Sequence, residues 1–214
     1  MLKDTINKMT FRVRKRLVLS LISEKLAAIG FNIRAYYLTR EFLLDEIHQN
    51  LKPELGPLVA EVLSSSAIID IYNHPESKTL ARDNKRLVEE GYMCFGLKFG
   101  NEVITYLWCN LIKCHEVHPF LLKEDEAYLA RAFTFNTYRG KNMAEFLRYE
   151  LYKYLKQIGR NRIYAFIDMV NTSSIKMQKK LKAEPLKIVI NIKIFNKYNW
   201  NIMMRSSKKF LLAI

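Results

Sequence analysis

Residues 139–144, Arg-Gly-Lys-Asn-Met-Ala, have the composition of a site for a bound anion. They follow an aromatic, β-prone segment and precede an apolar stripe at helical spacing. The first turn of a helix offers unpaired backbone N–H groups and the positive end of the helix dipole. Gly140 allows close approach to the backbone, and Arg139 and Lys141 add positive charge. Asn142 tolerates the left-handed conformation of a curled phosphate loop. Taken alone, an ordinary strand-to-helix turn with solvated basic side chains would look similar.

A second group of polar residues, His115-Glu116-Val117-His118, contains two histidines three positions apart before Pro119. This spacing differs from the HExxH pattern of zinc sites and no third ligand is evident, so no metal is expected. The segment is interpreted either as a loop at the acceptor site or as an ordinary surface loop. No series of nucleophile, His and acid is recognisable, and neither is a P-loop.

The elements that must position these residues follow from periodicity and turn residues. We expect helices over 7–29, 40–50, 54–64, 77–90, 143–158 and 172–181, and strands over 31–38, 92–99, 102–112, 126–136, 162–168 and 186–195. Gly100-Asn101 predicts a tight hairpin turn. Because helices and strands alternate only in the later part, we expect an α/β (α+β) domain whose mixed, mostly antiparallel central sheet is flanked by helices.

The segment 139–144 resembles the R/Q-x-x-G-x-G/A pyrophosphate motif of the GCN5-related N-acetyltransferase (GNAT) family, with Arg139 first, Ala144 last and Asn142 in place of the central Gly. After a helix and a strand, residues 171–183 (NTSSIKMQKKLKA) resemble the family's N-x-x-(A/S)-I pattern, which ends in K-L-G-F. Lys182-Ala183 stands where Gly-Phe is usual. The order of elements agrees with that fold over about residues 92–196.

This resemblance implies a GNAT-like fold with acetyl-CoA as acyl donor and no metal. The strand at about 128–136 would splay from the strand at 162–168, and pantetheine would pair with backbone groups of Phe133 and Phe135. The implied cofactor-binding residues are Phe133, Phe135, Arg139, Gly140, Lys141, Asn142, Ala144, Asn171 and Ser174.

The resemblance also implies direct attack of an amine on the thioester, so catalysis depends on positioning and on proton removal. A base near the start of the splayed strand points to Glu126, with Asp125 or Glu124 as alternatives. The family's acid, a Tyr seven residues after the Asn, is Gln178 here, and Tyr128 and Tyr164 are candidate substitutes. We expect Asp168 to cap the following turn.

The predicted function is transfer of an acetyl group to a primary amine of a small molecule or a peptide. An aromatic, mixed-charge acceptor pocket is suggested by Tyr36, Tyr37, Tyr92, Tyr106 and Trp108. The alternatives are a catalytically silent GNAT-like module, or a basic module that binds nucleic acid or a membrane. The carboxyl-terminal motifs favour the enzyme, and nucleic acid is the less favoured partner.

Composition supports a single cytoplasmic domain. The 214 residues are 50% apolar, with 7 Gly and 5 Pro, which suits one domain over 31–214 preceded by a basic amphipathic helix over 1–30. The charge of +14 gathers at both ends, so the first helix is interpreted either as an extra helix packed on the domain or as a candidate for peripheral membrane contact. Its run over 17–30 is interrupted and too short to span a bilayer. The three cysteines predict buried, reduced thiols.

Overall fold

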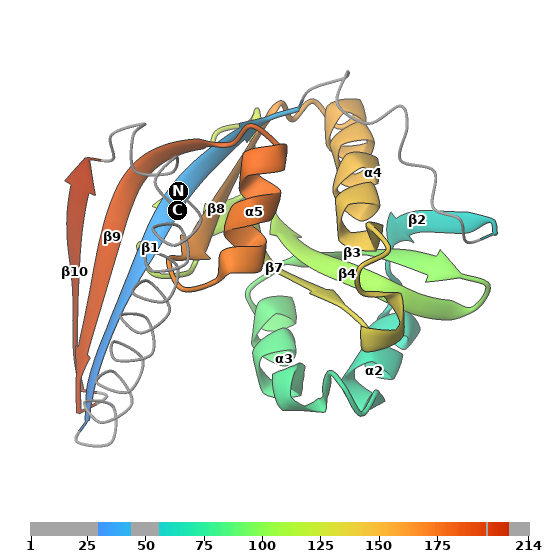
Figure 1. Cartoon of the computed structure of the whole chain (residues 1–214), viewed down its shortest axis with the longest axis horizontal. Helices are drawn as coiled ribbons and strands as arrows, with labels where there is room; N and C mark the ends of the chain where they lie inside the picture. The colour runs from blue at the N-terminus through green and yellow to red at the C-terminus, as the bar shows by residue number, and fades with distance from the viewer. Residues whose placement is uncertain (1–29, 44–55, 196, 206–214) are drawn as a thin grey trace, which may run out of the picture.

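The computed structural model describes residues 30–43, 56–195 and 197–205. The helix predicted over 7–29, and with it the basic extension, lies outside the described residues, as does most of the segment 40–50. Within the described part, eight strands form one sheet in the order β10-β9-β1-β8-β7-β4-β3-β2 (Figure 1). Their bounds are β1 Phe31–Phe42, β2 Leu58–Val62, β3 Met93–Phe99, β4 Glu102–Asn110, β7 Glu126–Thr134, β8 Arg162–Asp168, β9 Glu184–Ile194 and β10 Tyr198–Arg205.

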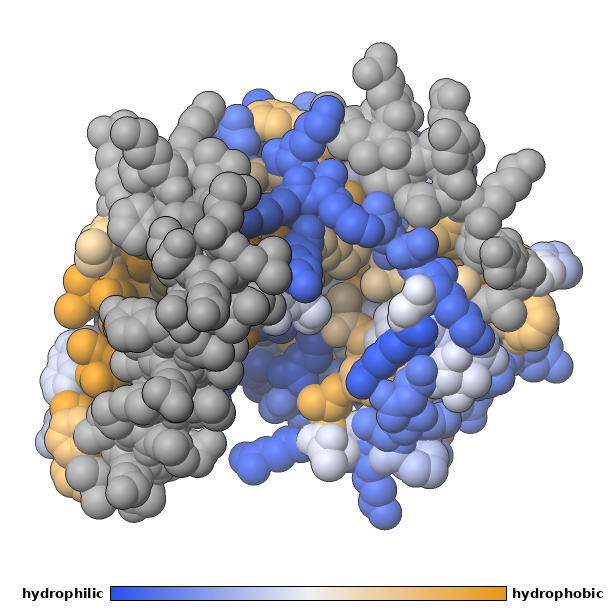
Figure 2. Space-filling view, viewed as in Figure 1, coloured by the Kyte–Doolittle hydropathy of each residue, from blue (hydrophilic) through white to orange (hydrophobic). Residues whose placement is uncertain are grey.

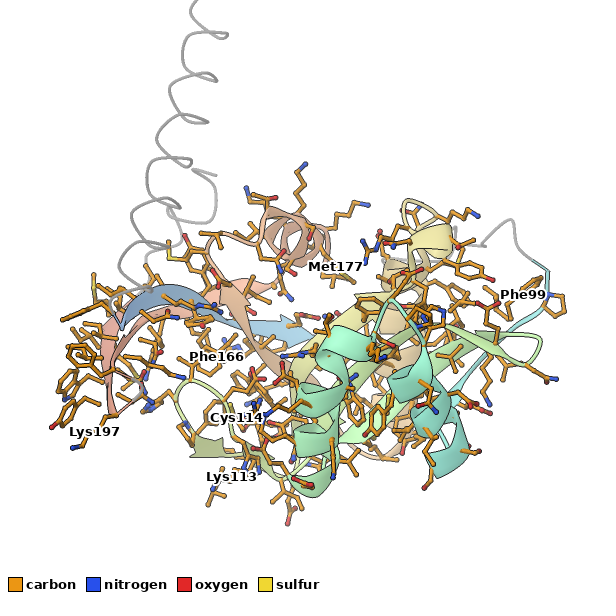
Figure 3. The ribbon with its side chains drawn as sticks, turned by 90° about the horizontal axis from the view of Figure 1, so that it is seen from below. Phe99, Lys113, Cys114, Phe166, Met177 and Lys197 are labelled. Atoms are coloured by element: carbon orange, nitrogen blue, oxygen red, sulfur yellow. The ribbon has the colours of Figure 1, made fainter. Side chains whose placement is uncertain are left out.

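The sheet is mixed and mostly antiparallel, as predicted. β7 and β8 are parallel, and the other neighbouring strands of the sheet run antiparallel. A right-handed crossover through a helix is the usual way to join two parallel neighbours, and the helix α4 makes this connection between β7 and β8. The long sheet extends from Phe99, at the tip of the β3–β4 hairpin, to Lys197 between β9 and β10 (Figure 3).

Helices lie on both sides of the β2–β3–β4–β7 half of the sheet (Figure 1). Helix α4 packs on one side, and α2 and α3 lie on the other, while α5 lies over the β1–β8 half. The helices are α2 Ser65–Asn73, α3 Ala81–Glu89, α4 Met143–Gln157 and α5 Thr172–Lys180, and short 3₁₀ turns occupy Lys78–Leu80 and Asn136–Tyr138. Two-residue strands β5 Lys113–Cys114 and β6 Phe120–Leu121 pair with each other beside the sheet.

Helix α4 could be predicted from the sequence because one stripe of its side chains packs in the core. Its apolar positions Met143, Leu147, Leu151 and Leu155 are all buried, at most 2% exposed. They recur at intervals of four, which places them on one stripe of the helix. Gly159, with φ 79°, takes the left-handed conformation just after the helix ends. The three cysteines are buried and free, as predicted.

Several expected elements were wrong. Residues 54–64, predicted as helix, contain the strand β2, which pairs with β3 at the edge of the sheet. Helix α2 and strand β10 were not predicted. The first strand continues to Phe42 instead of ending at Leu38, because it pairs with β8 up to Arg162. In these cases long-range pairing outweighs the local residue preferences on which the prediction depended.

The N-terminal strand β1 occupies an interior position of the sheet. It lies between β8 and β9, antiparallel to both, although it precedes them by more than a hundred residues in the chain. Strand β10 then pairs with β9 at the outer edge. This arrangement brings residues of β1, β9 and β10 next to the carboxyl ends of β7 and β8, where the candidate site forms.

Candidate active site

A gap opens between β7 and β8. The two strands pair only from Glu126↔Arg162 to Leu129↔Ala165. Beyond that point β7 follows β4, and β8 follows β1 to Asp168. The strands therefore separate in a V, as the sequence predicted, and the edge of β7 that faces the gap has backbone groups available for a ligand.

The backbone direction of β7 identifies the groups that face the gap. The Phe135 N–H donates to the Ile104 carbonyl at 3.2 Å, and the Phe133 carbonyl accepts from the Thr105 hydroxyl at 2.9 Å. Both groups therefore point toward β4. Because strand residues alternate, the groups of Ala132 and Thr134 point into the gap. The backbone groups of the predicted residues Phe133 and Phe135 thus face β4, and those of Ala132 and Thr134 face the gap.

The rings of Phe133 and Phe135 have a packing role. They lie 5.3 Å apart, edge to face, and each contacts the ring of Tyr106. Phe135 is 3% exposed and closes the core at the end of the strand. The predicted pairing of Phe133 and Phe135 with pantetheine does not agree with the direction of these backbone groups, which point away from the gap.

The loop after β7 has the conformation of an anion site. Gly140 and Asn142 are both left-handed, with φ of 76° and 59°. Asn142 precedes the first residue of α4, and its side chain caps no backbone N–H. Alternation of left-handed residues at a helix start creates a concave array of N–H groups that suits phosphate. The exposed Lys141 lies over the Tyr138 ring, 5.7 Å from its centroid.

Arg139 is held close to this loop. Its Nε donates to the Thr134 carbonyl at 2.9 Å, and its guanidinium lies 5.5 Å from the centroid of the Phe133 ring. No described residue accepts a hydrogen bond from its other guanidinium nitrogens, which suits them to an anion. The predicted residues Arg139, Gly140, Lys141 and Asn142 therefore lie in one loop that leads into Ala144 of α4, and none of the five lines the cavity between β7 and β8.

A cavity of about 630 Å³ occupies the V and continues over the face of β1, β9 and β10. Figure 2 shows the molecule hollowed near its middle, with hydrophilic residues in the hollow. Two parts of its lining come from different elements. The part that we name the cofactor half, after the expected position of acetyl-CoA, is lined by Ala130 and Ala132 of β7 and by Asn171, Ser174 and Met177 around α5. The acceptor half is lined by Arg34, Tyr36, His115, Glu116, Val117, Pro119, Asn191, Lys193, Asn199 and Asn201.

Asn171 and Ser174 also form the cap of α5. The Asn171 side-chain oxygen accepts from the Ser174 backbone N–H at 3.1 Å and from the Ser173 hydroxyl at 2.9 Å. Such a cap stabilises a helix by about 1 kcal/mol. The two predicted residues therefore border the cavity and start the helix that closes its cofactor half. Asp168 caps the intervening turn, as predicted, by accepting from the Val170 N–H at 3.0 Å.

Glu126 lies away from the cavity. It is 7% exposed, at the closed end where β7 and β8 still pair, and its carboxylate accepts from the Tyr164 hydroxyl and the Lys123 N–H, each at 3.0 Å. Arg162 approaches to 3.9 Å. A carboxylate held in this way stabilises the start of the strands, so its position does not support the predicted role as a base.

Glu116 is the carboxylate that reaches the cavity beside β7. Its pKa is raised, chiefly by burial, and the Tyr128 hydroxyl donates to it at 2.9 Å. A raised pKa brings a carboxylate closer to the range in which a general base works. Tyr128 is fully buried and touches the cavity only through this bond. The sequence placed the loop 115–118 near an acceptor site as one alternative, but did not single out Glu116.

Tyr36 lines the acceptor half next to Arg34. Burial raises the pKa of the Tyr36 hydroxyl, the neighbouring Arg34 opposes this, and the charges of Asp168 and Glu116 raise it further. Of the five aromatic residues expected in the acceptor pocket, Tyr36 lines it. The others, Tyr37, Tyr92, Tyr106 and Trp108, are core residues at most 5% exposed.

Gln178 lies where the family's acid would be, and its amide has a fixed direction. Its Nε2 donates to the buried Glu41 carboxylate at 2.7 Å. Glu41 also receives the Tyr152 hydroxyl and pairs with Arg148 at 3.4 Å. A carboxylate accepts only, so the Gln178 oxygen must point away from it. That oxygen is buried and has no hydrogen-bond partner in the described part of the chain, and the residue borders the cavity. Gln178 therefore presents an acceptor, and no acidic proton, to a ligand.

A sequence model of the acetyltransferase (GNAT) family matches residues 58–182, which are more than half of the chain and include β7, the loop, α4, β8 and α5. The chain therefore belongs to the GNAT acetyltransferase family. No curated protein sequence matches it.

Solved structures show the same fold at low identity. A tandem GNAT protein from the clavulanic acid biosynthesis pathway is 14% identical, with a TM-score of 0.53 over 85% of this chain and 58% of that one. A protein of unknown function from Staphylococcus epidermidis is 11% identical, with a TM-score of 0.53 over 80% and 65%. A glucosamine N-acetyltransferase region of a fungal multidomain β-N-acetylglucosaminidase is 14% identical, with a TM-score of 0.56 over 84% and 23%. The chain thus spans less than two thirds of each.

The described helices are all too short or too polar to cross a membrane.

Proposed function

We propose that this GNAT protein transfers an acetyl group from acetyl-CoA to a primary amine by direct attack in a ternary complex. The observation that carries the proposal is the V between β7 and β8, which is continuous with an uncapped helix start. Ala132 and Thr134 offer backbone groups along one side of the V, and the left-handed loop around Asn142 lies beyond its open end. An extended amide chain that ends in a pyrophosphate fits such an arrangement.

Different parts of the chain would bind the cofactor and orient the amine. The Gly140–Asn142 turn, with Arg139 and Lys141, would hold the pyrophosphate. The edge of β7 would hold the pantetheine in extended form. When bound, acetyl-CoA supplies the thioester that the amine attacks. The protein then orients the amine and accepts a proton from its nitrogen.

Glu116 supports the role of general base better than Glu126. It borders the cavity, its pKa is raised by burial, and the Tyr128 hydroxyl fixes one oxygen. The second oxygen has no hydrogen bond from a described residue and would accept from a ligand amine. Tyr128 becomes a positioning residue, since its hydroxyl is committed to Glu116. Tyr36, whose raised pKa keeps it protonated, is the hydroxyl in the acceptor half that could donate to a departing thiolate.

One observation favours a catalytically silent module as the second candidate. Gln178 replaces the acidic hydroxyl of the family, and Glu41 holds its amide in the direction that presents only an oxygen. A CoA thiolate leaves without an obligatory acid, so this feature lowers the expected rate and does not exclude transfer.

The test is a titration with acetyl-CoA by calorimetry, followed by mass spectrometry of a panel of primary amines. We expect saturable acetyl-CoA binding and a mass increase of one acetyl group in some amines. Binding without any acetylated product would favour the silent module. Failure of millimolar acetyl-CoA to bind or to raise the melting temperature would refute the proposed function.

A further inference from the structure

The acceptor half contains a row of polar side chains across three strands. Arg34 of β1 pairs in register with Asn191 of β9, and Asn191 pairs with Asn201 of β10. One row further along the strands, Lys193 pairs with Asn199. Directly opposed residues have Cβ atoms about 5 Å apart and diagonal neighbours about 7–8 Å apart, so long side chains in these rows meet. All five side chains border the cavity.

The asparagines in this row have defined amide directions. The Asn191 Nδ2 donates to the side-chain oxygens of Asn199 at 2.6 Å and Asn201 at 2.7 Å. The Asn201 nitrogen donates in turn to the Val117 carbonyl of the covering loop. The acceptor oxygens of Asn199 and Asn201 are thus occupied from within the protein. Among the described residues the Asn199 nitrogen has no partner, so this residue has a donor to offer a ligand.

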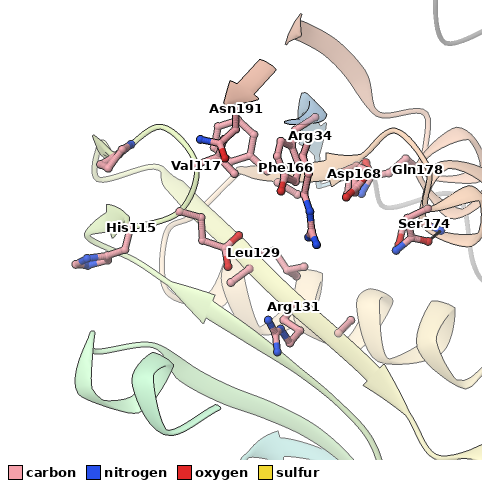
Figure 4. Close-up of a pocket in the computed structure, with 18 of the residues that line it drawn as sticks. Arg34, His115, Val117, Leu129, Arg131, Phe166, Asp168, Ser174, Gln178 and Asn191 are labelled. Atoms are coloured by element: carbon pink, nitrogen blue, oxygen red, sulfur yellow. Dashed lines mark hydrogen bonds between the residues drawn. The ribbon is translucent and has the colours of Figure 1, made fainter. Parts of the chain in front are cut away.

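The cations of the cavity differ in their pairing. Arg131 pairs with Asp83 at 2.9 Å, Arg148 with Glu41 at 3.4 Å, and Arg86 with Glu90 at 3.8 Å. Within the part of the chain that the structure describes, neither Arg34 nor Lys193 forms an ion pair. Figure 4 shows the Arg34 side chain extending into the cavity between Phe166 and Arg131. The acceptor half therefore holds two positive charges that form no ion pair with a described carboxylate.

The carboxylates that border the cavity accept hydrogen bonds from other parts of the protein. Asp168 accepts from the Val170 N–H, and Glu116 accepts from the Tyr128 hydroxyl beside β7. A ligand that complements this half must offer an amine to Glu116 and a negative group to the donors of Arg34, Lys193 and Asn199. Charge-assisted bonds from a guanidinium to a carboxylate or phosphate are among the strongest polar contacts in proteins.

We propose that the acceptor is an amine that carries its own anionic group, a carboxylate or a phosphate, and that Arg34 binds this group. The inference rests on the proposed function, because it names the acceptor class of the same site. Tyr36, beside Arg34 on the same strand, orients the guanidinium, and Lys193 and Asn199 supply the remaining donors.

The experiment compares matched pairs of amines in the full-length protein with acetyl-CoA. Glycine and glycinamide form the carboxylate pair, and phosphoethanolamine and ethanolamine form the phosphate pair. The ratio of kcat/KM between the charged and the neutral member is measured for the wild type and for Arg34→Gln. Differences in amine basicity cancel between the two proteins. Arg34→Lys tests rescue by a retained charge, and Arg82→Gln, an exposed arginine of α3 outside the cavity, is the matched control.

We expect the wild type to favour the charged member of one pair, and Arg34→Gln to lower that ratio about 10- to 100-fold, mainly through KM. The pair that shows the preference identifies the anion. Arg34→Lys should restore part of the ratio, and Arg82→Gln should leave it unchanged. Equal rates for both members of both pairs, or a ratio insensitive to Arg34→Gln, would overturn the inference while the proposed function stands. Failure of acetyl-CoA to bind would instead remove the proposed function, and the inference with it.

Discussion

The cofactor half and the acceptor half of the cavity are built in opposite ways. The cofactor half is lined by β7 and by residues around α5. The loop 139–144 and the helix α4 follow directly after β7 in the chain, so the groups that we expect to hold the cofactor are mainly backbone groups of one continuous segment. The acceptor half joins β1, the loop 115–119, β9 and β10, which lie far apart in sequence, and it presents side chains. Backbone groups are the same for every residue, so the first half tolerates departures from the family motif. The second half depends on the identity of each residue.

The largest effect is expected from Glu116→Gln in the acceptor half. Loss of the general base should lower kcat by about 100- to 10,000-fold and leave the affinity for acetyl-CoA unchanged. Steady-state kinetics and calorimetry measure the two effects separately. Glu124→Gln, an exposed carboxylate before β7, is the matched control and should retain activity. An active Glu116→Gln enzyme would rule out this assignment.

The pH dependence sharpens the same prediction. Since only the carboxylate form accepts a proton, kcat/KM of the wild type should rise with pH through the pKa of Glu116, which burial places above the ordinary value of 4.5. For Glu116→Gln this rise of kcat/KM should be absent, and only the rise that accompanies deprotonation of the amine should remain. If kcat/KM of the variant rose over the same pH range as that of the wild type, another group would be responsible for the pH dependence.

A smaller effect, on the affinity for acetyl-CoA and not on kcat, is expected from the loop that follows β7. Replacement of both Arg139 and Lys141 by Ala should weaken acetyl-CoA binding about 10- to 100-fold, because two charge-assisted contacts with the pyrophosphate are lost while the backbone site remains. Calorimetry measures the affinity, and the melting temperature should change little. The control is the exposed pair Arg82→Ala and Lys85→Ala on α3. Unchanged affinity would remove the phosphate-loop assignment.

The smallest effect is expected on stability. It concerns Lys182, a departure from the family motif that lies in neither half of the cavity. Lys182 stands where the family has Gly, and its φ is 53°, a left-handed conformation that costs a residue with a Cβ about 1 kcal/mol. Lys182→Gly should therefore raise the free energy of unfolding by about 1 kcal/mol and leave acetyl-CoA affinity unchanged. Urea unfolding measures it. Lys179→Gly, inside α5, should instead lower the stability by about the same amount. Destabilisation by Lys182→Gly would contradict this interpretation.

Prediction from sequence succeeded where the information is local. The loop around Gly140, the left-handed Asn142 and the helix α4 were all read correctly, because their spacing and residue types act over a few positions. The predicted cap at Asp168 is confirmed for the same reason. The backbone groups of Phe133 and Phe135 were predicted to face the gap but point to β4, because the pairing of β7 with β4 decides which groups face the gap.

The less accurate predictions concern the parts that long-range pairing decides. Residues 58–62 form a strand because β3 offers an edge, although their local pattern suggested a helix. Glu126 and Glu116 are both glutamates near aromatic residues in the sequence. Only the separation of β7 from β8 makes the first a closed-end residue and brings the second to the cavity.

By itself the sequence determined the family, the mixed sheet and the left-handed loop before α4 that we propose as the anion site. These follow from motif spacing and from hydrophobic periods that are independent of distant parts of the chain. Only the tertiary structure decided that β1 lies between β8 and β9, and therefore that Arg34 and Tyr36 face the cavity. The physical reason is that a strand's neighbours are selected by hydrogen bonding and packing across the whole sheet, which no short stretch of residues specifies.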